Sequence, residues 1–286
     1  MTNNNEEQDD FVVTSESIIN PKALINALNA HDEVIRLVKA STTKRNAPCS
    51  ENISLFRDLL TDNEGETFFR QSSNANTATT SYWLSRIKHT AQLLLNLQSV
   101  PEYQPISTDQ IYQITRMSPA PENIRLVSSA LLNLGIILIF DEQLKGMKLD
   151  GAVFKLKSGH PVIGMTLRHS RLDNFWFTLT HELSHIHLHL DQLETPILDD
   201  FEEASTEEIE LEADRLTKTI FVSRNEWRNC EPKYDLRREI VIKYANEKGL
   251  HPAIIAGMLR HELNRYEIFS DIVSEYNTRD LVFKHE

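Results

Sequence analysis

Residues 173–190 read DNFWFTLTHELSHIHLHL and contain no glycine or proline, so the sequence predicts one uninterrupted helix. Within this stretch, His181-Glu182-Leu183-Ser184-His185 fits the pattern HExxH. Residues four apart on a helix point about 40° from each other, so both imidazoles face one side, one turn apart, as two ligands of one zinc ion must. A separate apolar stripe predicts the contact with the core and consists of Leu179, Leu183, Ile186 and Leu190.

A catalytic zinc site needs a third protein ligand and an open position for water. Twenty-five residues beyond His185, a second helical stretch carries Glu210 and Asp214 at positions i and i+4, hence on one face. Glu210 would complete a His₂Glu site. Asp214 would accept a hydrogen bond from the free ring nitrogen of His181 and fix its tautomer. Two alternative ligands lie on the same helix, Glu208 and Glu212.

Glu182 adjoins a predicted ligand and has the chemistry of a general base. A carboxylate near a zinc-activated water can take its proton during attack on a peptide carbonyl and pass it to the leaving amine. The alternative is a helix whose histidines and Glu182 have structural partners and hold no metal. The distal acids Glu210 and Asp214 favour the metal site over that alternative.

Two further histidines follow on the same predicted helix. His189 lies four residues beyond His185 and leans towards the metal side, so we expect it beside the ligands or in a structural role. A third histidine ligand would need a glycine-broken turn and a longer spacing, which this helix lacks. His187 is turned about 160° from His185, and we expect it to pack.

An acyl-transfer site also needs a side chain that stabilises developing negative charge, normally Tyr, His or Arg. No pattern selects one residue here, and four are eligible: Tyr244, His251, Arg168 and Arg171. The predicted strand 161–167 precedes the HExxH helix. If it is an edge strand, an extended polypeptide substrate would pair with it through main-chain hydrogen bonds.

The net charge of the chain disfavours nucleic acid and favours a basic protein as its partner. The 286 residues hold 30 basic and 42 acidic side chains, for a net charge of −12, which disfavours a protein that coats nucleic acid. Eleven of the carboxylates lie in residues 191–214, which contain no Lys or Arg. Without these eleven, the net charge would be −1 instead of −12. Most of these acids are expected to be solvated and to form a negative rim that favours a basic partner, such as a DNA-binding regulator. Neutralising four of them is expected to weaken partner capture without emptying the zinc site: Asp199, Asp200, Glu202 and Glu203.

The sequence predicts neither a membrane span nor secretion. The longest apolar run, Leu134 to Phe140, is far shorter than the roughly 20 residues of a membrane helix. Residues 1–10 are polar and acidic, unlike a secretory signal, so we expect a cytoplasmic protein. The two cysteines, Cys49 and Cys230, are expected to be unpaired thiols.

The predicted fold class is α+β. It is mostly helical, with a small three-stranded antiparallel sheet packed on a zincin-type pair of active-site helices. Three regions are expected: a flexible acidic tail at 1–20, an N-terminal helical region at 21–117 and a metallopeptidase-like domain at 118–286. In the N-terminal half, helices are expected at 21–40, 55–60, 79–98 and 121–134, the last ending at Gly135, and a further one begins at the capping box Ser107–Gln110. In the C-terminal half, helices are expected at 173–190, 206–221, 235–247 and 252–268. Strands are expected at 136–140, 152–157 and 161–167.

The sequence resembles the ImmA/IrrE family of metallo-endopeptidases, a gluzincin-like group. The similarity is carried by residues 149–152, 161–190, 199–203, 208–227 and 249–262. It is closest to the branch in which the domain follows an Xre-type or HigA-like repressor, although only some 20 residues precede the first expected helix, too few for such a repressor. The resemblance implies zinc as the cofactor, His181, His185 and Glu210 as its ligands, and Glu182 as the base.

The expected function is a zinc-dependent endopeptidase that cleaves a specific cytoplasmic protein. The resemblance implies that the substrate is a transcriptional regulator in a stress, mobile-element or phage-defence setting. The alternative is a non-catalytic, antitoxin-like regulator that keeps the metal and acts by partner binding. Residues 236–261 mimic a helix-turn-helix, but their second helix carries only Arg260 as a fixed positive charge, so direct nucleic-acid binding is not expected.

Overall fold

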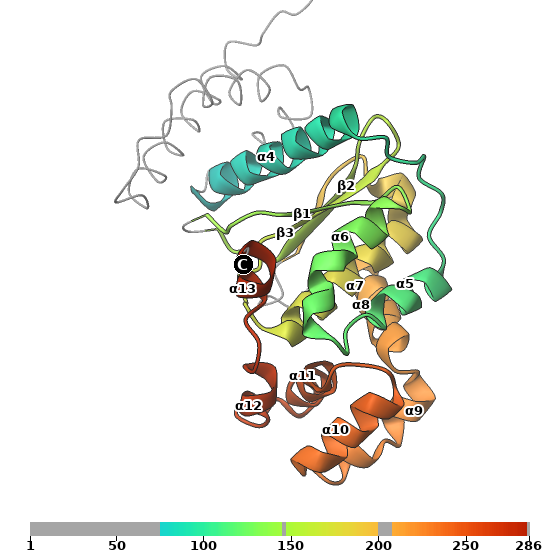
Figure 1. The fold of residues 1–286 in the computed structure, drawn as a ribbon, viewed down its shortest axis with the longest axis vertical. Helices are drawn as coiled ribbons and strands as arrows, with labels where there is room; N and C mark the ends of the chain where they lie inside the picture. The colour runs from blue at the N-terminus through green and yellow to red at the C-terminus, as the bar shows by residue number, and fades with distance from the viewer. Residues whose placement is uncertain (1–74, 145–146, 200–207, 285–286) are drawn as a thin grey trace, which may run out of the picture. The chain divides into compact units, whose positions relative to one another are not determined.

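The computed structural model describes residues 75–144, 147–199 and 208–284. These residues form a mostly helical unit with one small sheet (Figure 1). The expected acidic tail, the helices at 21–40 and 55–60, and Cys49 lie outside the described residues. The helix expected at 79–98 is present as α4, Ala75–Leu97. None of the helices in the described ranges has the length and apolar character that crossing a membrane requires.

The sheet has four strands in the order β1-β3-β2-β4. Their bounds are Ile137–Phe140 for β1, Gly151–Lys155 for β2, Pro161–Met165 for β3 and Ile197–Asp199 for β4. β2 runs antiparallel to both β3 and β4, whereas β1 runs parallel to β3. The predicted three-stranded antiparallel sheet is therefore wrong in the number of strands and in the direction of β1.

The connections explain both errors. β2 and β3 form the expected hairpin around Gly159, which adopts a φ of 87° that only glycine takes readily. Between β1 and β2 the chain has ten residues, 141–150, which allow β2 to lie beyond β3 instead of beside β1. An apolar run indicates that a strand exists, but it does not determine which other strand lies beside it. β4 has only three residues inside the acidic segment, too few for an alternating pattern.

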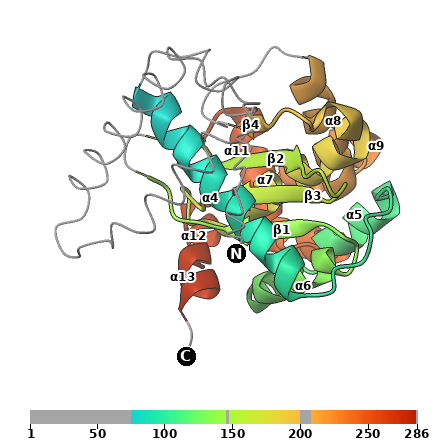
Figure 2. The ribbon, with the colours of Figure 1, turned by 90° about the horizontal axis from the view of Figure 1, so that it is seen from above.

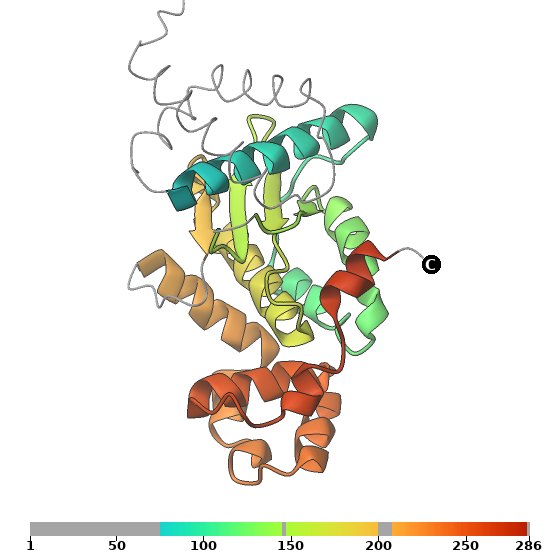
Figure 3. The same ribbon diagram turned by 90° about the vertical axis from the view of Figure 1, so that its left-hand side faces the viewer.

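Helices cover both faces of the sheet. Figures 2 and 3 show α4 crossing one face of the strands, with α7, Leu172–His189, on the opposite face. The buried Trp83 of α4 lies so close to β3 that a Cβ on Gly164 would be 2.7 Å from its ring. All five residues of β3 are buried, as expected of a strand covered on both sides. The core therefore lies on either side of β3.

Two smaller predictions hold at helix ends. α5, Thr108–Thr115, begins with the expected capping box, in which Ser107 Oγ accepts from the Gln110 amide and the Gln110 side chain accepts from the Ser107 amide. A short 3₁₀ turn, Pro121–Asn123, leads into α6, Ile124–Leu132. Gly135 follows with a φ of 76°, as expected for the residue that ends this helix.

The C-terminal part is a run of helices. They are α8 Glu208–Phe221, α9 Arg224–Arg228, α10 Arg238–Glu247, α11 Pro252–Leu263, α12 Ser270–Val273 and α13 Thr278–Phe283. The helix expected at 252–268 stops at Leu263, because Asn264 adopts a left-handed conformation with a φ of 51°. The three short helices α9, α12 and α13 are too brief for a periodic signal and were not predicted.

Candidate metal centre

The site is built where α7 packs against α8. The predicted apolar stripe of α7 holds the helix in place, since Leu179, Leu183 and Ile186 are all buried in the core. This packing turns His181 and His185 towards α8, from which Glu210 reaches back. The separation into an anchoring stripe and a histidine face is therefore confirmed.

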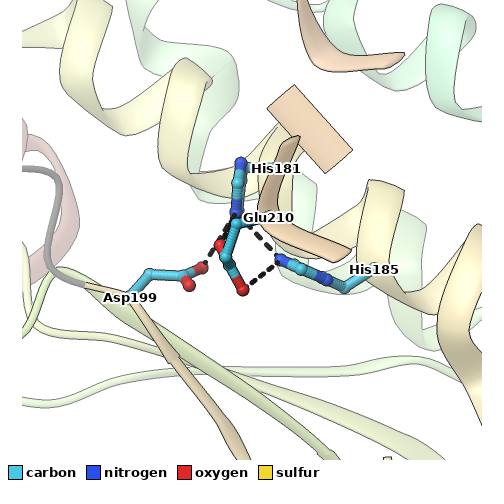
Figure 4. A group of neighbouring side chains, drawn as sticks. All are labelled: His181, His185, Asp199 and Glu210. Carbon is cyan, nitrogen blue, oxygen red and sulfur yellow. Dashed lines mark hydrogen bonds and ion pairs between the residues drawn. The ribbon is translucent and has the colours of Figure 1, made fainter. Parts of the chain in front are cut away.

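Figure 4 shows His181, His185 and Glu210 converging on one point together with Asp199. The Nε2 atoms of the two histidines lie 2.9 Å apart. Glu210 Oε2 lies 3.1 Å from His181 Nε2, and Glu210 Oε1 lies 3.4 Å from His185 Nε2. The four groups each offer one ligand atom, and all four atoms lie within 4.8 Å of one another. The structure thus brings together the three residues that the sequence predicted as ligands.

Asp199 is the residue that sequence reasoning placed wrongly. It ends strand β4, its side chain is only 4% exposed, and its Oδ2 lies 3.3 Å from His181 Nε2. It therefore belongs, with His181, His185 and Glu210, to the group of possible metal ligands, called the metal group below, and not to a solvated rim. Neutralising Asp199 would alter the site itself. The only available signal was the short apolar pair Ile197-Leu198 before it, which is too weak to predict a strand.

The separations fit a metal ion held by these groups. In a tetrahedral zinc site with ligand bonds of about 2.0–2.1 Å, neighbouring ligand atoms lie roughly 3.3 Å apart. The separations of 3.1 Å, 3.4 Å and 3.3 Å between carboxylate oxygens and imidazole nitrogens lie close to that value, and the 2.9 Å between the two Nε2 atoms is somewhat shorter. Two imidazole nitrogens and carboxylate oxygens, without a thiolate, form a donor set that suits zinc.

The second ring nitrogen of each histidine has its own partner. His181 Nδ1 lies 3.2 Å from Asp214 Oδ1, the contact that the i, i+4 spacing on α8 predicted. His185 Nδ1 lies 3.1 Å from His189 Nδ1, and His189 Nε2 lies 3.1 Å from Glu212 Oε2. These contacts leave both Nε2 atoms directed at the common point.

Burial and charge act in opposite directions across the site. Burial alone would lower the pKa of His181, but hydrogen bonds to Asp214 and Glu210 raise it to about 10. Burial alone would raise the pKa of Glu210, yet hydrogen bonds from His181 and His185 hold it below its ordinary value. The arrangement therefore stabilises Glu210 as a carboxylate, the form that binds metal.

Glu182 lies close to two members of this group, Asp199 and Glu210. Its side chain is fully buried, and its carboxyl group interacts with the carboxyl group of Asp199. Burial, followed by the nearby charges of Asp199 and Glu210, raises its pKa well above the ordinary value. A buried carboxyl with a perturbed pKa beside a group of possible metal ligands is a candidate for proton transfer.

Gly151 on β2 makes room for Glu182, a role that the sequence did not predict. A Cβ at Gly151 would lie 1.9 Å from Glu182 Oε1, so any larger residue would collide with the carboxylate. Thr178 Cγ2, 3.0 Å from the same Cβ position, closes the other side. The glycine of the Asp150-Gly151 pair thus positions Glu182, whereas the sequence marked it only as a residue preceding a strand.

The two arginines considered for charge stabilisation pair with aspartates. Arg168 donates to Asp150 Oδ2 at 3.0 Å, and the charge of Asp150 in turn acts on Glu182. Arg171 pairs with Asp173 at 3.0 Å at the start of α7, about ten residues or roughly 15 Å along the helix from His181. Of the two, only Arg168 has a partner that borders the site.

Tyr244 and His251 lie among the C-terminal helices instead. The pKa of Tyr244 is raised by burial and by the nearby groups Cys230 and Glu226, neither of which belongs to the metal group. His251 caps α11, with its Nδ1 accepting from the Ala253 amide at 3.1 Å. Both residues therefore have structural surroundings.

Three remaining expectations concern neighbouring groups. Of the two alternative ligands, Glu208 is exposed and Glu212 pairs with His189. His187 was expected to pack, but it is exposed, and its Nδ1 lies 2.7 Å from the Ile106 carbonyl oxygen. The proposal that 161–167 is an edge strand is wrong, because β3 lies between β1 and β2 and the edges are β1 and β4.

The structure also describes the segment that mimics a helix-turn-helix, residues 236–261. Arg260, its one fixed positive charge in the second helix, is buried on α11 and donates to the Tyr266 carbonyl. Arg260 therefore has a partner within the fold, and the expectation that this segment does not bind nucleic acid stays a prediction.

An HExxH helix whose two histidines meet a glutamate from a following helix, with a buried glutamate beside them, has the arrangement of a metallopeptidase centre. Residues 135–245 match the Peptidase_M78 family model, described as an IrrE N-terminal-like domain. Residues 135–245 therefore carry a domain of the ImmA/IrrE type, and the resemblance is confirmed at the level of the family, whereas the Xre-type or HigA-like branch stays a prediction. A search of curated proteins gave no match.

Proposed function

We propose that the protein is a zinc-dependent endopeptidase that cleaves one specific cytoplasmic protein. The observation that carries this proposal is the placement of Glu182, fully buried beside the His181, His185 and Glu210 group. A metal held only for structure has no need of a buried carboxylate beside it. Burying this carboxyl beside a second one, that of Asp199, costs stability, which a catalytic role would explain.

The proposed chemistry divides among the residues of the site. His181, His185 and Glu210 would hold the zinc ion, which would supply Lewis-acid activation of water and of the scissile carbonyl. Glu182 would accept the proton from the attacking water and deliver it to the leaving amine. Asp214 would hold His181 in the tautomer that presents Nε2. Gly151 would keep Glu182 in place.

The proposed substrate is a basic protein, and within the family resemblance a transcriptional regulator in a stress, mobile-element or phage-defence setting. Exposed acids of the described residues, such as Asp191, Glu194 and Glu208, flank the segment between α7 and α8. Their charge would steer a basic partner towards the site, and the effect would weaken with salt. Asp199 is not part of this set, because it is buried.

A substrate trap tests the proposal. The Glu182→Gln protein keeps the shape of the side chain but cannot accept the proton, so it should bind the substrate without cutting it. We expect it to co-purify with one protein from its native cells, which zinc-loaded wild type then cleaves. Failure of fully zinc-loaded wild type to cut any captured protein would refute the peptidase.

The second candidate is a non-catalytic regulator that keeps the metal fold for partner binding. One observation favours it: Asp199 offers a fourth protein group to the metal, as in closed structural sites. The two functions differ in the trap experiment. If the protein is a regulator, wild type and Glu182→Gln should capture the same partner equally well, and the partner should stay intact with both.

A further inference from the structure

Strand β4 occupies one edge of the sheet, directly beside the metal group. It pairs antiparallel with β2 in the register Val153 to Ile197, Ala152 to Leu198 and Gly151 to Asp199. The Asp150 amide also donates to the Asp199 carbonyl oxygen at 2.8 Å. β4 therefore covers the edge of β2, which would otherwise be open to an added strand.

β4 is held in the way a bound peptide would be held. Leu198 is 40% exposed, whereas Ile197 is partly buried against the core. All three residues pair with β2 through the backbone, and Asp199 is the one of the three that is buried. Main-chain pairing plus one inserted side chain is the way an extended peptide joins a sheet edge.

The inserted side chain ends among the predicted metal ligands. Asp199 Oδ2 lies 3.3 Å from His181 Nε2, about the same separation as those between Glu210 and the two histidines. Its backbone lies opposite Gly151, the residue that packs on Glu182. A catalytic zinc site has three protein ligands and one open position, and a fourth carboxylate would close it.

We propose that β4 is an internal pseudosubstrate: it pairs with β2 where an extended substrate would pair, and Asp199 fills the metal position that catalysis needs open. The described conformation is then latent. Withdrawal of residues 197–199 frees the edge of β2 and the fourth position together, and an extended polypeptide takes their place. This inference rests on the proposed peptidase and names how that same site is regulated.

Binding of a small metal ligand tests the closed position without any substrate. The full-length protein is loaded with Co²⁺, whose visible absorption reports its coordination, and is titrated with acetohydroxamate, which needs an open position. We expect Asp199→Ala to bind acetohydroxamate at least tenfold more tightly than wild type. Asp199→Asn should also bind more tightly, since an amide is a weaker ligand than a carboxylate. The matched control is Asp191→Asn, which removes an exposed charge from the same acidic segment and should behave as wild type.

Two results would overturn the inference. Equal affinity of wild type and Asp199→Ala for acetohydroxamate would show that Asp199 does not close the position. Loss of Co²⁺ from both Asp199 variants would show that Asp199 is an indispensable ligand and not a displaceable one. Neither result bears on cleavage by the zinc-loaded protein, and a tenfold gain in Asp199→Ala without any cleavage would refute the peptidase while leaving the closed position in place.

Discussion

The helix pairs α7–α8 and α10–α11 both carry histidines at positions that sequence reasoning marked as functional, yet their surroundings differ. Between α7 and α8, His181 and His185 face Glu210 and Asp199. At the start of α11, His251 faces a backbone amide and lies edge-on to Tyr276, with ring centroids 5.6 Å apart. The difference teaches that the groups facing a histidine, more than its position in the sequence, decide whether it can bind a metal.

Burial sharpens the same contrast. The α10–α11 pair is an ordinary apolar contact, with buried residues that include Val241, Ala245, Ile254 and Leu259. On α7, by contrast, four polar side chains are buried: His181, Glu182, Ser184 and His185. Such burial costs free energy unless the groups are paired or bind an ion, so we expect mutations to affect metal binding in the first pair and only stability in the second.

The largest effect is expected from His185→Ala. One of four zinc ligands contributes roughly 3 kcal/mol, a quarter of the folding-linked affinity typical of structural zinc sites, so the affinity for zinc should fall at least about a hundredfold. Competition with a chromophoric chelator measures it. The matched control is His187→Ala on the same helix, whose ring contacts the Ile106 carbonyl and which should keep wild-type affinity. Equal losses in the two variants would remove the distinction between the two faces of α7.

Gly151→Ala should come next. The new Cβ would displace the carboxylate of Glu182, and a shift of about 1 Å in a catalytic group can cost about a hundredfold in rate. Cleavage of the trapped substrate should fall by that factor while zinc affinity stays within about threefold of wild type. In the control Gly159→Ala the new Cβ meets no atom within 4 Å, so cleavage should be unchanged. The φ of 87° at this position should strain only the hairpin. Full activity in Gly151→Ala would argue against Glu182 as the base.

Asp214→Asn tests the group behind His181. Loss of the carboxylate that orients a histidine ligand typically costs tenfold to a hundredfold in metal affinity, so zinc binding should weaken by about that much. Lys218, which pairs with the same carboxylate at 3.3 Å, provides the control. Lys218→Gln should change the affinity little, because that ion pair is exposed. A similar drop in both variants would mean that surface charge, and not orientation, sets the affinity.

The smallest effect is expected in the second helix pair. His251→Ala removes the N-cap of α11 and should lower the free energy of unfolding by about 1 kcal/mol, which shifts the melting temperature by about 2–4 °C. Zinc affinity should not change. A loss of zinc binding in this variant would mean that the two helix pairs are coupled, and the contrast between them would fail.

Much of the site follows from spacing on single helices. HExxH places His181 and His185 one turn apart, and Glu210 and Asp214 repeat that spacing on α8, so each pair shares a face whatever the tertiary fold. The structure confirms that these faces meet. Local rules work here because every relation lies within one helix.

The parts that were wrong depend on contacts between distant segments. The parallel pairing of β1 with β3 depends on which strand lies beside which, and hydrophobic pattern does not encode that. Asp199 looks like one more acid in a charged run, and only the pairing of β4 with β2 brings it to His181. Gly151 is likewise significant only because Glu182 lies against it.

Zinc K-edge X-ray absorption on the full-length protein is the most direct test of the metal centre. The account predicts one zinc ion per chain, bound by two imidazole nitrogens and carboxylate oxygens at about 2.0–2.1 Å, with no sulfur ligand. The His181→Ala and His185→Ala variants should each lose an imidazole contribution. A sulfur ligand, or a zinc environment unchanged by both substitutions, would contradict the placement of the centre between α7 and α8.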